Sequence, residues 1–598
     1  MKKRILCMFL AVLMIFGAFT ALTSCGGGKN NNNNNSNLCA DGHDWNSKTG
    51  KCKVCSTKCT HAEYGEDDKC VECGYTKKSS GGNSGGDDYA EVPWADDEPI
   101  NLFFMMSDNS SGESLPSGCN RYLAGGNQRQ DEPIDADVEE RNSAAEYITN
   151  VKLKYDYYTE HSDYGWGKCY ELISSTIGTT GCPDMFCNFT YDMVASSLRG
   201  SFANLRDTEL DMRLNFFQFL DEDFDEEVDN KGYMYEYMTS VTLNSAKMYL
   251  LASDYFLDLI RAFYIVPVNV ALLERVGMGV TGDLDGDGVF TIEDFYEEIR
   301  QKKWDYDKVA AYSAAVYSND NKKIASEDIG DTLGFVVHTG YISSGMIYST
   351  DITVIDRSKT DANGNPAYEY PDESPELYEL FDNAKKLVNS TGVYVLDTKA
   401  DPGYIEFGNG GALAVRKRFC PNKVLFGGII MLGTLEYNEY QVLKESSGFG
   451  VAPVPFYHTV AEDSSERYLT SVHNAARPGA IARSTKNFTA CTAFLDYQST
   501  HSTDILNKYY ENFCVSIVDS SVDGTIEMVE YIRKNVRTAF DKTFEDAIGV
   551  YYSDTTIRWS YILEIKYYDY DVRQDYREYA PFKEELLIRL YKEYDNLP

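Results

Sequence analysis

Hydrophobic and polar positions alternate along the chain in blocks that predict strands and helices in turn. Residues 100–106 form an apolar run that is typical of a strand buried on both faces. A helix predicted at about 139–149 precedes residues 151–157, where every second residue is apolar, as in a second strand. A further helix near 167–177 leads to a third predicted strand at 183–189. This order predicts an α/β protein with a parallel sheet and right-handed crossovers.

The middle and the end of the chain repeat these patterns. A strand is predicted at 262–268, helices at 292–301 and 375–389, and two strand-like segments at 411–415 and 449–454. From about residue 500 the pattern becomes helical, with two amphipathic stripes. These stripes are Met528, Val529, Ile532 and Val536, and then Leu586, Leu587 and Leu590.

Polar residues follow the first and the third predicted strands. Asp108 and Asn109 come after the first strand, and Asn188 and Tyr191 come after the third. In parallel α/β sheets, ligands bind beyond the carboxyl ends of the strands. The sequence therefore predicts a ligand-binding edge at these four residues.

The first 24 residues have the pattern of a secretory signal. A basic start is followed by a short apolar stretch and by small residues in front of Cys25. Leu22-Thr23-Ser24-Cys25 resembles the lipobox of bacterial lipoproteins, which implies that Cys25 is diacylated and becomes the mature N-terminus. The alternative is an ordinary signal peptide in which Cys25 is incidental. No other stretch is long and apolar enough to span a bilayer.

Residues 39–76 contain a duplicated cysteine and histidine motif, between a flexible tether at 25–38 and a linker at 77–97. The segment has too few apolar residues to fold unaided, so we expect zinc to hold each copy through three thiolates and one imidazole. Three disulfides, or one zinc shared by both C-x-x-C pairs, are the alternatives. The module resembles small zinc-ribbon-like repeats of exported Gram-positive proteins. The predicted ligands are Cys39, His43, Cys52 and Cys55 in the first copy, and Cys59, His61, Cys70 and Cys73 in the second.

The segment 283–294 fits the twelve-residue calcium loop of EF-hands. Carboxylates of Asp283, Asp285 and Asp287 occupy its first, third and fifth positions, and Gly288 permits the sharp turn. The carbonyl of Val289 and the carboxylate of Asp294 complete the predicted Ca²⁺ ligands, with Asp in place of the usual Glu. The alternative is an acidic turn that caps a helix beginning at Thr291.

Charge and motifs exclude several other functions. With 56 basic and 93 acidic residues, the net charge of −37 disfavours binding to nucleic acid or to anionic lipid headgroups. No Walker A motif, H-E-x-x-H or G-x-S-x-G is present. The G-x-G-x-x-G match at 277–282 follows a predicted helix and is interpreted as a chance match. Seven cysteines lie beyond the duplicated module, so at least one thiol among them is free, most simply as a small buried hydrophobe.

Four segments together resemble the extracellular solute-binding proteins of ABC importers that carry sugars and oligosaccharides. They are the 191–205 segment after the third strand, Tyr264–Asn269 with the helix that follows, Phe407–Ala414, and Gly448–Pro455. The resemblance covers about 98–598 and implies a two-lobed periplasmic-binding-protein-like fold of type II. It places lobe 1 at about 98–262 and 455–515, and lobe 2 at about 263–454 and 516–598.

The resemblance also implies a function. The protein would be a monomeric, non-enzymatic lipoprotein. It would be anchored to the outer face of the cytoplasmic membrane of a Gram-positive bacterium. It would capture a sugar or oligosaccharide by lobe closure and deliver it to a membrane permease. Sugar recognition needs aromatic faces and hydrogen-bonding side chains. The ligand-binding residues expected on this basis are Asp108, Asn109, Asn188, Tyr191, Tyr264 and Trp559.

Two other functions stay open at the level of sequence. A secreted carbohydrate-active enzyme would turn over oligosaccharides, whereas an adhesive or scaffold lipoprotein would bind no small molecule. Peptides, lipids or metal ions also remain as alternative cargo, because one binding architecture serves many solutes.

Overall fold

The computed structural model describes residues 94–108, 134–159, 169–206, 237–256, 261–319, 332–355, 374–396, 415–512, 524–547 and 571–597, with short gaps in several of these ranges. The chain divides into two compact units, Met1–Asp88 and Tyr89–Pro598, and all described residues belong to the second. Five predictions fall outside the described residues: the signal and Cys25, the duplicated cysteine and histidine module, Asn109, Trp559 and the strand at 411–414.

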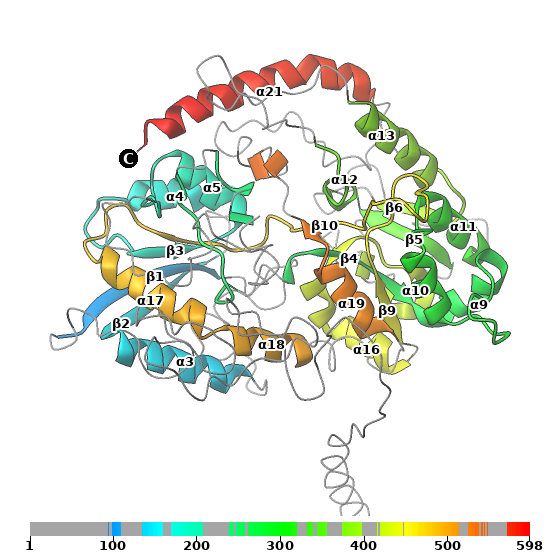
Figure 1. Cartoon of the computed structure of the whole chain (residues 1–598), viewed down its shortest axis with the longest axis horizontal. Helices are drawn as coiled ribbons and strands as arrows, with labels where there is room; N and C mark the ends of the chain where they lie inside the picture. The colour runs from blue at the N-terminus through cyan, green and yellow to red at the C-terminus, as the bar shows by residue number, and fades with distance from the viewer. Residues whose placement is uncertain are drawn as a thin grey trace, which may run out of the picture. The chain divides into compact units, whose positions relative to one another are not determined.

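The first sheet has four strands in the order β11-β3-β1-β2. Figure 1 labels β1, β2 and β3 of this sheet. Strands β1 (Ile100–Asp108), β2 (Val151–Thr159) and β3 (Met185–Cys187) are mutually parallel where they pair, as the sequence predicts. The fourth strand, β11 (Gly479–Ile481), comes from a distant part of the chain and runs antiparallel to β3. The sheet is therefore completed only when the chain returns to it.

Burial along β1 corrects one expectation from the sequence. Leu102, Phe104 and Met106 are buried, but Phe103 and Met105 between them are only partly buried. The strand thus buries one face fully, and the other face is partly covered by a long polar side chain. The ammonium group of Lys154 on β2 lies 4.5 Å from the centroid of the Phe103 ring.

Five helices accompany this sheet in the described part of the chain, and with it they form the first half of the second unit. Helix α17 packs against α3 and β1, and α18 packs against α3. The five are α3 (Ile134–Ile148), α4 (Cys169–Thr176), α5 (Thr190–Leu198), α17 (Phe488–Thr500) and α18 (Thr503–Asn512).

The second sheet has six strands in the order β6-β5-β7-β4-β8, with β9 also paired to β4. Strand β5 is parallel to β6 and β7, whereas β4 is antiparallel to β7, β8 and β9, so the sheet is mixed. The strands are β4 (Tyr264–Asn269), β5 (Leu333–His338), β6 (Val393–Leu396), β7 (Val424–Phe426), β8 (Ile430–Met431) and β9 (Phe449–Ala452).

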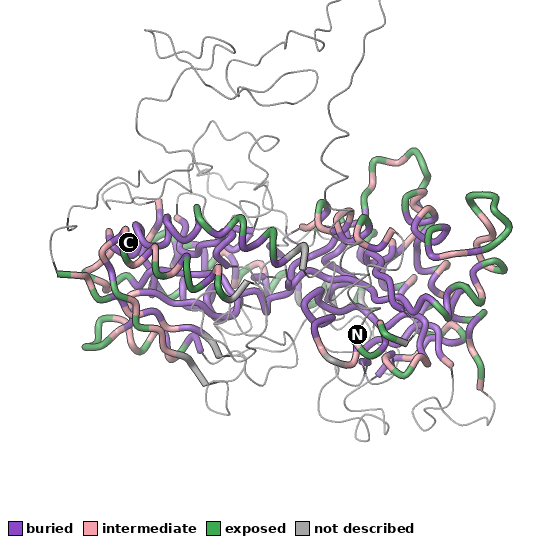
Figure 2. The backbone as a smooth tube through the Cα atoms, turned by 90° about the horizontal axis from the view of Figure 1, so that it is seen from below, coloured by how far each residue is buried: buried purple, intermediate pink, exposed green. Residues whose placement is uncertain are grey.

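Helices also cover the second sheet, and the two together form the second half. Helix α11 packs against α9 and β5, and α19 packs against β9. The strands of both sheets are mostly buried, and exposed positions lie mainly on helices and connections (Figure 2). The helical segments are α9 (Val270–Val280), α10 (Ile292–Arg300), α11 (Tyr306–Val316), α12 (Ser344–Tyr348), α13 (Pro375–Val388), α16 (Asn438–Ser446), α19 (Thr525–Arg533), the π-helical turn η4 (Phe419–Lys423) and the 3₁₀ turn η5 (Leu432–Glu436).

Three chain segments lie side by side where the chain passes between the two sheets, and we call them the crossing segments: 261–264, 470–473 and 535–537. Phe263 bridges to Val472, and β10 (Thr470–Ser471) pairs with β12 (Val536–Arg537) in parallel. The predicted apolar stripe of the 528–536 helix therefore ends early. Ile532 is buried in α19, but Val536 belongs to β12, because the chain leaves the helix to pair with β10.

Helix α21 (Val572–Asp595) contacts both halves of the unit. It touches α13 in the second half and α5 in the first, and Figure 1 shows it running from one to the other. Leu587 and Leu590 are buried, as predicted, and Leu586 is half-buried. Their spacing places one apolar stripe of the helix against the body.

Three further expectations have outcomes in the described residues. The G-x-G-x-x-G match begins inside α9, where Gly277 is buried against the Phe290 ring, so it is not a phosphate-binding turn. Val415 lies in a helical turn and not in a strand. No disulfide joins the described cysteines, three of which are buried; they are Cys169, Cys182, Cys187, Cys420 and Cys491. Among the described residues, no helix has the length and apolar composition needed to cross a membrane.

Candidate functional site

The carboxyl end of β3 carries a buried amide, Asn188. Its Oδ1 accepts a hydrogen bond of 2.7 Å from the Phe189 N–H. Its Nδ2 is buried and has no hydrogen-bond partner within the described structure. An amide donor that is buried without a partner costs free energy, which a ligand acceptor would recover. Asn188 therefore stays a candidate ligand-binding residue.

Two aromatic rings follow Asn188 in the chain. The rings of Phe189 and Tyr191 stack with 5.9 Å between centroids and 3° between planes. The guanidinium carbon of Arg477 lies 4.5 Å from the centroid of the Phe189 ring. Phe189, Tyr191 and Arg477 are all more than 90% buried. The result is a layered group of flat side chains at the end of β3.

Residues 474–477 hold this group in place from the returning chain. The Thr190 N–H donates to the carbonyls of Asn474 and Ala476, at 3.1 and 2.9 Å. The Thr190 hydroxyl lies 2.6 Å from the hydroxyl of Tyr237, whose pKa burial raises despite that hydrogen bond. The start of α5 is thus fixed by backbone bonds to the strand connection that leads into β11.

Tyr264 is the predicted ligand residue that lies in the second half. It lies at the start of β4 and is fully buried. Its hydroxyl is 2.8 Å from the hydroxyl of Ser344 in α12, and its ring meets the edge of His473 at 5.7 Å. The Tyr264 hydroxyl thus already has a protein partner. A solute contact with this residue would involve its ring or follow a change of partner.

Of the six predicted ligand residues, the structure brings two together at one place. Asn188 and Tyr191 both lie at the β3 end, and Tyr264 lies beyond the crossing segment that ends at His473. Asp108 ends β1, the neighbour of β3 in the sheet. Sequence reasoning missed Phe189, Arg477 and Tyr237. Arg477 is 290 residues from Cys187, whose Sγ lies 3.5 Å from the Arg477 carbonyl, and no local pattern signals that contact.

The acidic loop before α10 gathers three carboxylates. One oxygen atom from each of Asp283, Asp285 and Asp287 lies within 4.8 Å of the others. Gly286 and Gly288 adopt φ of +86° and +89°, which allows the tight turn. Their N–H groups donate to the two carboxylate oxygens of Asp283, at 2.6 Å each. These bonds, from Gly288 first, lower the pKa of Asp283.

Mutual repulsion within the loop favours a cation. The pKa of Asp285 is raised, although the N–H of Asp287 lowers it, because desolvation, Asp283 and the charges of Asp287 and Asp294 outweigh that bond. A bound dication would relieve this repulsion. The oxygen donors, their spacing and the glycine turn fit Ca²⁺.

Asp294 has a structural role of its own. Its Oδ1 accepts from the Leu284 N–H at 2.7 Å and its Oδ2 from the Thr291 N–H at 2.8 Å. With Thr291 it forms a capping box at the start of α10. The acidic turn therefore does cap the helix. The Oδ1 also accepts from the Asp285 N–H at 3.3 Å, so the second lone pair of Oδ2 is the one that a cation could use at Asp294.

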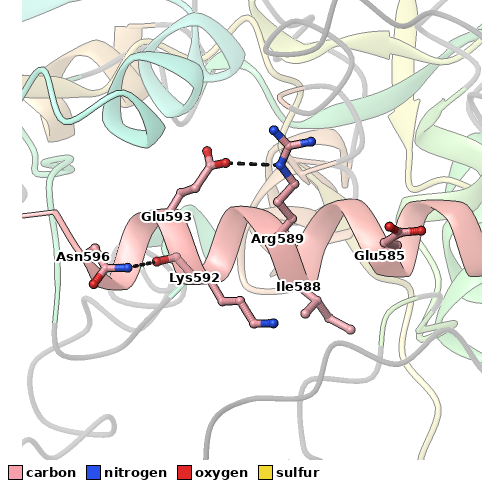
Figure 3. A pocket seen from close by; sticks show the side chains of 6 residues that line it. All are labelled: Glu585, Ile588, Arg589, Lys592, Glu593 and Asn596. Atoms are coloured by element: carbon pink, nitrogen blue, oxygen red, sulfur yellow. Dashed lines mark hydrogen bonds and ion pairs between the residues drawn. The ribbon is translucent and has the colours of Figure 1, made fainter.

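A surface depression lies along α21 (Figure 3). Arg589 and Glu593 form an ion pair of 3.3 Å across it, and the Asn596 Nδ2 donates to the Lys592 carbonyl at 2.6 Å. One helix supplies every lining residue, and two of the four charged side chains, Arg589 and Glu593, pair with each other. We therefore do not consider it a solute site. It is lined by Glu585, Ile588, Arg589, Lys592, Glu593 and Asn596.

Comparisons with solved structures give similarities to binding proteins at low identity. The GacH receptor of Streptomyces glaucescens is 14% identical, with 81% of this chain and 99% of that chain covered and a TM-score of 0.42. The galacto-N-biose-/lacto-N-biose I-binding protein of an ABC transporter from Bifidobacterium longum is 9% identical, with 83% and 98% covered and a TM-score of 0.45. A designed esterase is 15% identical, with 82% and 99% covered and a TM-score of 0.45.

No protein-family model matches the chain, and no curated protein matches its sequence. At this level of similarity, the function has to be argued from the chain's own residues.

Proposed function

We propose that this protein is an extracellular solute-binding lipoprotein that captures a sugar or oligosaccharide between two lobes and delivers it to an ABC importer. In this proposal the lobes of the type II fold are built on the two sheets, and the three crossing segments form the hinge. Solute contacts both lobes and shifts the population toward the closed form by its differential affinity. The permease then recognises the closed form.

The observation that carries the proposal is the buried Asn188 amide beside the crossing segments. Its donor is unsatisfied, and the stacked rings of Phe189 and Tyr191 follow it directly in the chain. Sugars present hydroxyl acceptors beside apolar ring faces. The four segments that resemble sugar-binding ABC proteins support the same function. Asp108, Asn109 and Trp559 are proposed to add further polar and stacking contacts.

The remaining predictions belong to the same proposal. The lipid on Cys25 would anchor the protein outside the cell, and the module of residues 39–76 would hold zinc as a spacer or docking element. Calcium at Asp283, Asp285, Asp287, Val289 and Asp294 would stiffen the turn before α10. None of these groups takes part in solute chemistry.

A thermal-shift screen tests the function. The purified protein is heated with acarbose, lacto-N-biose and maltotriose, which similar structures bind, and with peptides as comparison ligands. A ligand at 100 times its dissociation constant stabilises the fold by about 2.7 kcal/mol. Mass spectrometry of the recovered ligand then separates binding from turnover. Chemically altered sugar would establish an enzyme, and the absence of any shift would favour a scaffold protein.

A further inference from the structure

A buried ionic network lies next to the crossing segments. Arg261 donates from Nε to the Glu436 Oε1 at 2.9 Å and from Nη2 to the Glu436 Oε2 at 3.0 Å. The Tyr509 hydroxyl donates to the Glu436 Oε1 at 2.6 Å and accepts from the Arg261 Nε at 3.2 Å. The side chains of Arg261 and Glu436 are 0% and 6% exposed, so this network is screened little by solvent.

The three residues come from different parts of the architecture. Arg261 begins the first crossing segment, where the neighbouring Ala262 carbonyl accepts from the His473 N–H at 2.8 Å. Glu436 ends η5, which follows β8 and packs against α16 in the second half. Tyr509 lies on α18, which packs against α3 in the first half. The hydrogen bond from Tyr509 to Glu436 thus joins the two halves directly.

Geometry makes this bond sensitive to movement of the halves. In the bidentate pair between Arg261 and Glu436, Arg261 belongs to a crossing segment. Rotation about the hinge therefore changes the distance between these two residues little. The bond between Tyr509 and Glu436 joins one residue of each half, so movement of the halves acts on it directly. A shift of about 1 Å between α18 and η5 would take it beyond hydrogen-bonding distance.

We propose that the network of Arg261, Glu436 and Tyr509 is an interlobe latch that holds the two halves in the arrangement of this structure. The latch rests on the proposed hinge movement. It adds a free-energy cost to any change from the present arrangement of the halves, and solute binding has to offset that cost. Breaking the bond of Tyr509 leaves the Arg261 and Glu436 charges paired with each other. The latch can therefore open without exposing an isolated buried charge.

Tyr509→Phe tests the latch, because it removes one hydroxyl and keeps the ring. Tyr312→Phe is its matched control. The Tyr312 hydroxyl is also buried and donates to a buried glutamate, Glu298, at 3.1 Å, but both residues lie in the helix layer of the second half. Tyr509→Phe loses the hydrogen bonds to Glu436 and Arg261, and Tyr312→Phe loses those to Glu298 and Thr281. Each variant loses two hydrogen bonds, so their denaturation midpoints are expected to fall by similar amounts.

The measurement is the distance between the halves in solution. Spin labels are placed by non-canonical amino acids at Tyr147 on α3 and Val442 on α16, which are 87% and 62% exposed. This route avoids the partly exposed native thiols Cys182 and Cys420. Tyr509→Phe is expected to raise the population outside the main distance on the order of tenfold, and Tyr312→Phe to leave it as in the wild type.

Each outcome decides the proposal. If both variants keep the wild-type distances while acarbose, lacto-N-biose or maltotriose changes them, the hinge stands and the latch is wrong. If both variants broaden the distances equally, the effect is general loosening and the latch is also wrong. If no variant and no sugar changes the distance, the latch and the proposed hinge movement fail together.

Discussion

At the scale of single residues, a substitution of Asn188 is expected to change solute binding much more than protein stability. Replacing Asn188 by Leu removes the unpartnered Nδ2 and also the acceptor of the Phe189 N–H. These two changes oppose each other, so the free energy of unfolding should change by less than about 1 kcal/mol. Solute affinity should fall at least about tenfold, because a donor to the sugar is lost. Chemical denaturation and calorimetric titration measure the two effects.

Asn204 provides the matched control for Asn188. Its Oδ1 accepts from the N–H groups of Arg206 and Met248, at 3.1 and 2.9 Å. Asn204→Leu should lower stability and leave affinity unchanged. If Asn188→Leu behaved in the same way, Asn188 would be a structural residue and not a ligand contact.

At the scale of elements, replacing two glycines of α9 by alanine is expected to change the stability of the fold in opposite directions. A Cβ at Gly277 would lie 2.0 Å from the Phe290 ring, whereas one at Gly279 would meet no atom within 4 Å. Gly279→Ala should stabilise the fold by about 0.5–1 kcal/mol through helix propensity. Gly277→Ala should destabilise it by about 1–3 kcal/mol, because overlap with a buried ring outweighs the same gain. Equal effects in denaturant titrations would mean that α9 does not pack closely on Phe290.

The acidic loop that follows α9 is expected to make the stability of the protein depend on calcium. Calcium at ten times its dissociation constant should stabilise the protein by about 1.4 kcal/mol, read as a rise in the thermal midpoint that a chelator reverses. Asp283→Asn should abolish this rise, because Asp283 supplies one of the three clustered carboxylates. Asp463→Asn removes a comparable exposed charge outside the cluster and should keep it. A rise that persists in Asp283→Asn would place calcium elsewhere.

Some elements of this fold can be predicted from the sequence, and others cannot. β2, α10 and α13 follow from local periodicity, because each turns its apolar positions to one face. β10, β11 and β12 have two or three residues each and carry no periodic signal. Their pairing is decided by distant segments of the chain. The same reason separates Asn188 and Tyr191, which a strand end predicts, from Arg477, which reaches Phe189 only through the return of the chain.

At the scale of the whole second unit, α21 links the halves with very different strength at its two ends. Near its C-terminus, Tyr594 is buried, meets the Tyr249 ring edge-on at 5.2 Å and donates to the Lys247 carbonyl at 3.1 Å. Near its N-terminus, Arg573 pairs with Asp382 at 3.1 Å, but both side chains are more than half exposed. Exposed ion pairs contribute about 0–1 kcal/mol, so the contact with α13 is the weaker one.

This asymmetry implies that α21 moves with the first half when the lobes move. Tyr594→Ala should lower the free energy of unfolding by about 3 kcal/mol, and Arg573→Ala by less than about 1 kcal/mol. In hydrogen exchange, the first two turns of α21 should exchange faster than the turns around Leu590 and Tyr594. The described side chains of the first two turns are exposed, whereas Leu590 and Tyr594 are buried. Uniform protection along the helix would show that α21 holds both halves equally. In that case the hinge could move only if the whole helix detached, and lobe closure would cost far more than one surface ion pair.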